Sequence, residues 1–192
     1  MFSLRDMPAS PLAFLLEAYS TRAPSLFLVT GPSGSGKTYW CQQVVEHARQ
    51  QGWVVAGLLA PPVMEGEEKV GIELLDLSSG ERRPLATRLT LAERASGEGP
   101  AGLTFGCWRF NHDVLVWGNG VLRDIDSADL LIVDELGPLE FRQQQGLQAA
   151  FPLLDGWRYR LACVTARPSL VGAVRMRWPW SQVLVLGDAT HD

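Results

Sequence analysis

Apolar residues in this sequence gather in short unbroken runs, separated by segments rich in glycine, proline and charge. Five such runs lie at residues 25–30, 53–60, 129–133, 159–165 and 182–186. A short unbroken apolar run is typical of a strand that is covered on both faces, as in a parallel sheet. The pattern therefore predicts an α/β fold in which helices flank a mostly parallel sheet.

Segments with apolar residues at helical spacing lie between these runs. They predict helices at residues 38–51, at residues 111–125 with Asn111 as N-cap, and at residues 169–176. A further apolar stripe at residues 11–22 predicts a helix that either packs on the domain or binds a protein partner. We therefore divide the chain into an N-terminal helical segment, 1–24, and one domain, 25–192.

The middle of the chain has a different pattern. Extended runs at residues 70–77 and 82–89 surround a four-residue polar turn, which predicts an antiparallel hairpin inserted at the edge of the sheet. Residues 90–102 are rich in glycine, glutamate, alanine and serine and are predicted to form a mobile loop. Residues 105–110 are predicted to form one further strand.

Composition narrows the class of protein. The chain has 192 residues and a formal net charge of −4, which does not favour a general nucleic-acid or membrane surface. Five arginines and three tryptophans lie between residues 157 and 180, but such a segment is more often a solvated surface than a nucleic-acid face. The three cysteines are far apart, and no apolar run is long enough to span a membrane. We therefore expect a cytoplasmic protein.

One segment carries a complete chemical pattern, G-x-x-x-x-G-K-[ST]. It consists of Gly31, Pro32, Ser33, Gly34, Ser35, Gly36, Lys37 and Thr38, between the first predicted strand and the first predicted helix of the domain. This is the phosphate-binding loop of nucleoside-triphosphate-binding proteins, whose backbone N–H groups surround a phosphate at a helix N-terminus. The pattern assigns Lys37 to the β- and γ-phosphates and the Thr38 hydroxyl to Mg²⁺.

A second pattern lies at the end of the apolar run at residues 129–133, where Asp134 and Glu135 follow directly. Parallel strands collect their ligand sites at their carboxyl ends, so Asp134 is expected to emerge beside the loop and hold Mg²⁺ through its water shell. Glu135 then remains to orient or deprotonate an attacking water. Thr165 and Arg167 end another run; both are candidates to sense the γ-phosphate, and Arg167 to stabilise transition-state charge.

In the order of these motifs along the sequence, the chain resembles the small P-loop nucleoside-triphosphatases, a family that includes the cancer-related nucleoside-triphosphatase and its thermophile relatives. The resemblance rests on residues 31–38, on the run from Asp134 to Glu140, and on the segments 71–73 and 84–86. It implies a RecA-like core and slow Mg²⁺-dependent hydrolysis of several nucleoside triphosphates. It also matches Glu140, without indicating a role for that residue.

Three functions remain in competition. The leading one is hydrolysis of ATP and GTP to the diphosphate and phosphate, which uses both carboxylates. The second is a nucleoside or nucleotide kinase, in which the predicted hairpin closes over an acceptor. The third is a switch protein whose nucleotide state controls a partner through the N-terminal helix.

Overall fold

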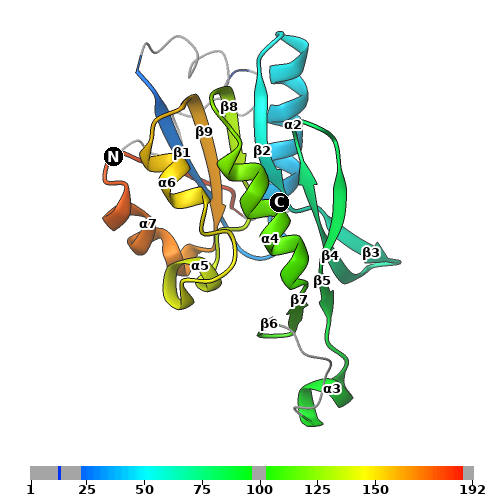
Figure 1. Ribbon diagram of the computed structural model, residues 1–192. Coiled ribbons are helices and arrows are strands. Elements are labelled where there is room, and N and C mark those ends of the chain that lie inside the picture. Colours follow the sequence, from blue (N-terminus) through cyan, green and yellow to red (C-terminus); the bar gives the residue numbers. More distant parts are fainter. Residues whose placement is uncertain (1–12, 14–22, 97–102, 188–192) are drawn as a thin grey trace, which may run out of the picture.

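The computed structural model describes residue 13, residues 23–96 and residues 103–187 (Figure 1). Apart from residue 13, the helix predicted at residues 11–22 lies outside these residues, and so does the second half of the loop predicted at residues 90–102. The division of the chain at residue 24 therefore stays a prediction. Among the described residues no helix is long and apolar enough to cross a membrane.

Five parallel strands form the core of the sheet. In spatial order they are β10 (Gln182–Val185), β1 (Ser25–Thr30), β9 (Tyr159–Ala166), β8 (Ala128–Val133) and β2 (Val55–Leu59). The parallel strands expected from the apolar runs are confirmed, but the described sheet as a whole is mixed, because antiparallel strands extend it beyond β2. β9 lies between β1 and β8, so the strand before the phosphate loop does not pair with the strand before the two acids.

The sheet continues beyond β2 with antiparallel strands. The predicted hairpin is confirmed as β4 (Glu68–Asp76) and β5 (Arg82–Arg88), and β4 also pairs with β2. An additional strand, β3 (Pro62–Glu65), pairs with β4. It was not predicted because all four of its residues are exposed and form no apolar run.

Two predictions in this region are wrong. The single strand expected at residues 105–110 is a pair, β6 (Leu103–Phe105) and β7 (Trp108–Phe110), because the chain reverses at Gly106 with a φ of 62°. The segment expected to be a mobile loop begins with a short helix, α3 (Leu91–Ser96). Thr90 and Glu93 cap this helix reciprocally, since each side chain accepts a hydrogen bond from the backbone N–H of the other.

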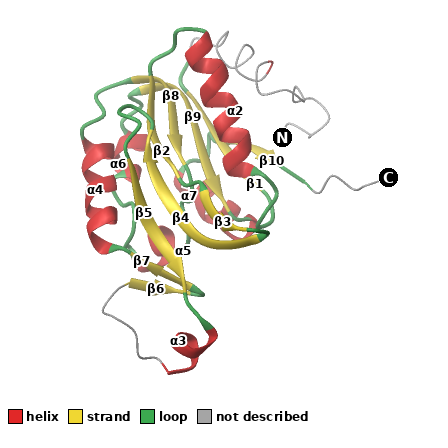
Figure 2. Ribbon diagram, turned by 90° about the vertical axis from the view of Figure 1, so that its right-hand side faces the viewer, coloured by secondary structure: helices red, strands yellow, loops and turns green. Residues whose placement is uncertain are grey.

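Helices cover both faces of the parallel core (Figure 2). One face is covered by α2 (Lys37–Gln50), and the other by α4 (His112–Arg123), α6 (Ala150–Asp155) and α7 (Val171–Arg177). Along β8, Leu131 and Val133 pack toward α4 and α6, whereas Leu130 and Ile132 pack toward α2. This alternation explains why β8 appears in the sequence as a continuous apolar run. The Asn111 side chain accepts hydrogen bonds at the start of α4, as predicted.

The arginine- and tryptophan-rich segment does not form one exposed surface. Trp178 is fully buried, and its indole N–H donates a hydrogen bond of 2.8 Å to Asp155. Its ring stacks on Phe151 and meets Phe141 edge-on, which closes the core between α6, α7 and α5 (Pro138–Gln143). Trp180, in contrast, is 45% exposed.

This difference predicts opposite results for two tryptophan substitutions. Trp178→Ala leaves a large cavity and removes one of the hydrogen-bond partners of Asp155, so it should lower the free energy of unfolding by about 3–5 kcal/mol. Trp180→Ala, the matched surface control, should lower it by less than about 1 kcal/mol. Urea unfolding followed by circular dichroism checks both values, and similar losses for the two variants would contradict the packing described here.

Candidate active site

The loop at residues 31–38 links β1 to α2 with the backbone that its pattern requires. A Cβ atom at Gly31 would lie 2.2 Å from the carbonyl oxygen of Leu186, so only glycine fits there. Gly34 and Gly36 have φ angles of 83° and 80°. Gly36 is the N-cap of α2 and forms no side-chain cap, so the N–H groups of the first helical turn stay available to an anion.

The side chains that the loop pattern singles out lie at one end of a cavity. Ser33, Lys37 and Thr38 all line it. The Lys37 ammonium donates hydrogen bonds to the carbonyl oxygens of Gly31 at 2.9 Å and Pro32 at 2.7 Å, which hold it against the loop. Partial burial lowers the pKa of Lys37, while the nearby carboxylates act in the opposite direction.

Asp134 is held at the carboxyl end of β8, and only 1% of its surface is exposed. One carboxylate oxygen accepts a hydrogen bond of 2.5 Å from the Thr165 hydroxyl, and the other accepts one of 3.0 Å from the Ala60 N–H. Thr165 lies near the end of β9 and Ala60 directly follows β2, and these strands are the two neighbours of β8. A buried carboxylate needs such partners, and here they also fix its orientation.

Glu135 lines the same cavity and adopts a left-handed backbone conformation with a φ of 67°. This conformation is unfavourable for a residue with a side chain and is typical of functional sites. The side chain is accessible to solvent, yet surrounding protein displaces bulk water and raises its pKa, and Asp134 raises it further. Lys69, Arg167 and Lys37 act against these effects.

Thr165 joins the two acids. Its hydroxyl donates to Asp134 and accepts a hydrogen bond of 2.7 Å from the backbone N–H of Glu135. Sequence analysis placed Thr165 among the groups that sense the γ-phosphate, but its hydroxyl is engaged with these acids. A role in sensing the γ-phosphate stays a prediction, and these hydrogen bonds favour a positioning role. This role was not visible in the sequence because it depends on β9 lying beside β8.

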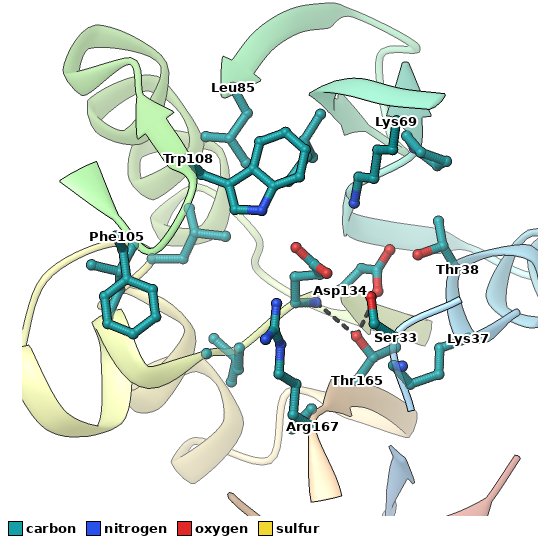
Figure 3. A pocket seen from close by; sticks show the side chains of 18 of the residues that line it. Ser33, Lys37, Thr38, Lys69, Leu85, Phe105, Trp108, Asp134, Thr165 and Arg167 are labelled. Carbon is teal, nitrogen blue, oxygen red and sulfur yellow. Dashed lines mark hydrogen bonds between the residues drawn. The ribbon is translucent and has the colours of Figure 1, made fainter. Parts of the chain in front are cut away.

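Arg167 follows β9 and is exposed on the wall of the same cavity. In Figure 3 its guanidinium points into the space beside Asp134. The structure therefore brings every residue predicted from the sequence to one cavity or to the loop that forms its end. The chemical roles of these residues remain predictions.

Glu140 has a structural role that the sequence did not indicate. It is 6% exposed, and its carboxylate accepts hydrogen bonds from the Gly137 N–H at 2.8 Å and from the Leu147 N–H at 2.9 Å. It therefore caps α5 and ties the chain that follows α5 to the segment after the two acids. Burial raises the pKa of Glu140 to about 7, although these hydrogen bonds act in the opposite direction.

The cavity extends well beyond the residues predicted from the sequence and has a volume of about 570 Å³. Figure 3 shows Phe105, Trp108 and Leu85 on the side of the cavity opposite Ser33, Lys37 and Thr38. Lys69 from β4 lies 5.1 Å from the centre of the Trp108 ring. Sequence analysis missed these residues because their elements approach the loop only through the antiparallel part of the sheet.

Comparison with known proteins identifies the family. A family model described as NTPase matches residues 26–183, which is most of the chain. This chain belongs to that NTPase family. It is therefore a hydrolase of nucleoside triphosphates, and the two predictions that depended on the resemblance, the family and the enzyme class, are confirmed.

Curated relatives of this NTPase include two archaeal proteins named nucleoside-triphosphatase THEP1. The protein of Thermococcus kodakarensis is 30% identical over 138 residues, which cover 71% of this chain and 73% of the relative. The protein of Thermofilum pendens is 30% identical over 151 residues, which cover 78% of each.

Solved structures agree with the fold of the NTPase. The solution structure of a human cancer-related nucleoside triphosphatase matches with a TM-score of 0.61 at 25% identity, over 88% of this chain and 90% of that one. The crystal structure of THEP1 from Aquifex aeolicus matches with a TM-score of 0.54 at 14% identity, over 83% and 87%, and supports the fold alone. The predicted RecA-like P-loop fold is confirmed.

The position of Thr165 between the two acids predicts an effect on turnover in this NTPase. Thr165→Val removes the hydroxyl that orients Asp134 and holds the Glu135 N–H, so kcat for phosphate release should fall about 10–100-fold with a smaller change in KM. Thr165→Ser keeps the hydroxyl and should stay close to wild type. Steady-state kinetics check this, and a wild-type kcat in Thr165→Val would exclude the positioning role.

The pKa of Glu140 predicts how stability depends on pH. The carboxyl of Glu140 has a pKa of about 7 in the folded state and near 4.5 in the unfolded state, so the folded state binds the proton more tightly. The protonated carboxyl therefore contributes its full stabilisation below about pH 4.5, and this stabilisation is lost as the pH rises through about 7. The loss amounts to about 3 kcal/mol. Urea unfolding at about pH 5 and about pH 8 measures most of it.

A pair of variants isolates this contribution. Glu140→Gln cannot titrate and should show a smaller fall in stability between the two pH values than the wild type, although it is less stable at the lower one. Glu46→Gln removes an exposed carboxylate on α2 and should keep the pH dependence of the wild type. Equal pH dependence in wild type and Glu140→Gln would show that Glu140 titrates normally.

Proposed function

We propose that this protein hydrolyses ATP and GTP to the diphosphate and phosphate in a Mg²⁺-dependent reaction. The observation that carries the proposal is that one cavity is lined both by the phosphate-loop residues Lys37 and Thr38 and by the acid pair Asp134 and Glu135. The curated relatives named nucleoside-triphosphatase support the reaction class. The resemblance described above implies several nucleoside triphosphates as substrates, and ATP and GTP are the two that we propose.

The residues at the phosphate loop suit Mg²⁺. The Thr38 hydroxyl and the Asp134 carboxylate offer oxygen donors in the same cavity, and Mg²⁺ prefers a few such ligands together with phosphate oxygens and water. Each Asp134 oxygen accepts one hydrogen bond from protein, which leaves lone pairs for the waters around a metal ion. When bound, Mg²⁺ supplies positive charge that neutralises the terminal phosphates.

The protein's own groups supply the remaining chemistry. Lys37 leaves its loop carbonyls to bind the β- and γ-phosphates, together with the N–H groups at the start of α2. Glu135 accepts a hydrogen bond from the attacking water and aligns it with the γ-phosphorus, and its raised pKa brings its basicity closer to that needed at neutral pH. Arg167 stabilises the charge that develops on the γ-phosphoryl oxygens.

Phosphate release from ATP and GTP tests the proposal directly. The wild-type protein should release phosphate from both when Mg²⁺ is present and stop when EDTA removes it. Lys37→Ala should lower kcat/KM by about 100-fold or more, because the charge at the β- and γ-phosphates is lost.

Arg175→Ala serves as the matched control, because it removes one positive charge from an exposed position on α7 and should keep wild-type activity. Phosphate release that survives both EDTA and Lys37→Ala would contradict the proposal.

A further inference from the structure

One end of the cavity is aromatic and has no part in the hydrolysis proposed above. We call it the aromatic arm and define it by Leu85, Phe105, Trp108, Phe110 and Leu115. These side chains come from β5, from the β6–β7 pair and from α4. The cavity of about 570 Å³ includes the phosphate-loop end, and its size is typical of a small-molecule site. The aromatic arm adds to this cavity a surface that one attacking water does not need.

The aromatic arm lies beyond the terminal phosphate, so it does not bind the base of the hydrolysed nucleotide. Figure 3 shows the loop side chains on one side of the cavity, Trp108 and Phe105 on the other, and Asp134 and Arg167 between them. If Lys37 holds the β- and γ-phosphates and Glu135 faces the γ-phosphorus, the base lies at the far end of the nucleotide. This step rests on the proposed function.

The chemistry of the arm suits a flat, polar ring. Phe105 and Trp108 are only partly buried, so part of each ring faces the cavity, and buried Leu85 and Leu115 complete an apolar surface. The Lys69 ammonium lies against the Trp108 ring, where it can also meet polar substituents of a bound molecule. Nucleobases bind to proteins in this way, by stacking on aromatic side chains next to cations.

We propose that the aromatic arm binds the base of a second molecule, a nucleoside or a nucleoside monophosphate, which accepts the γ-phosphoryl group in place of water. The acceptor oxygen forms a bond to the γ-phosphorus while the bond from that phosphorus to the bridging β-phosphate oxygen breaks. The electron pair leaves with the nucleoside diphosphate. A hydroxyl acceptor gives its proton to the Glu135 carboxylate, whereas an ionised phosphate acceptor has no proton to give.

Phosphoryl transfer to the acceptor and hydrolysis then take place at the same site and differ only in the oxygen that attacks the γ-phosphorus. Water attacks when the arm holds no acceptor, which accounts for hydrolysis. A bound base would occupy the space beside Glu135 and bring its own oxygen to the phosphorus, so transfer should outpace hydrolysis through proximity.

The balance between ATP consumed and phosphate released tests the proposal. The full-length protein is given ATP and Mg²⁺ together with adenosine, guanosine, cytidine or uridine, or with one of their 5′-monophosphates, at millimolar concentration. With a compound that serves as acceptor, the rate of ATP consumption should be about ten times the rate of phosphate release. Mass spectrometry should then find the phosphorylated acceptor. Comparing the nucleosides with their monophosphates distinguishes a nucleoside hydroxyl from a phosphate oxygen as the accepting group.

Substitutions then assign the transfer to the arm. Trp108→Leu should raise the KM for the acceptor about tenfold, because the ring on which the base stacks is lost. Phe105→Leu gives the same test at a second position if Trp108→Leu fails to fold. Trp180→Leu is the same chemical change at an exposed site away from the cavity and should leave the acceptor KM unchanged.

The possible failures are distinguishable. ATP consumption equal to phosphate release with every compound overturns the acceptor site and leaves hydrolysis standing. An acceptor KM that is unchanged in both Trp108→Leu and Phe105→Leu overturns the assignment to the aromatic arm. Absence of any ATP consumption, with or without acceptor, overturns the proposed function as well.

Discussion

The carboxylate of Asp134 is the buried charge on which the arrangement of the site depends. Its two oxygens accept hydrogen bonds from Thr165, at the end of β9, and from Ala60, just after β2. Three neighbouring strand ends are therefore fixed around one charged group. Because a buried carboxylate without partners is costly, the strands cannot shift their register here without a large loss of stability. The same bonds set the direction in which the next residue, Glu135, leaves the sheet.

The chain after Asp134 maintains this geometry. Glu135 turns with a positive φ, and its N–H is held by Thr165, while Glu140 binds the N–H groups of Gly137 and Leu147. The run from Asp134 to Glu140 therefore has two roles. All three acids border the cavity, but the carboxylate of Glu140 accepts hydrogen bonds from backbone N–H groups and stabilises the segment that supports Asp134 and Glu135. A charged residue that is conspicuous in a motif is therefore not necessarily a residue that touches substrate.

Local patterns in the sequence predicted much of this. The phosphate loop, the acid pair and the parallel strands are each coded by neighbouring residues, so their positions could be read without knowledge of the fold. What escaped prediction depends on strand order. Thr165 meets Asp134 only because β9 lies between β1 and β8, and Trp108 reaches the cavity only through β4, β5 and the turn at Gly106. Exposed β3 and short α3 had no apolar pattern to predict them.

The central claim is that Glu135, positioned through Asp134 and Thr165, directs water at a triphosphate held by the loop. It is tested most directly by Glu135→Gln, which keeps the size of the side chain but removes the base. Calorimetry should find the affinity for a non-hydrolysable ATP analogue within about threefold of wild type, and single-turnover phosphate release should fall about 100-fold or more. Phosphate release at the wild-type rate in this variant would contradict the account.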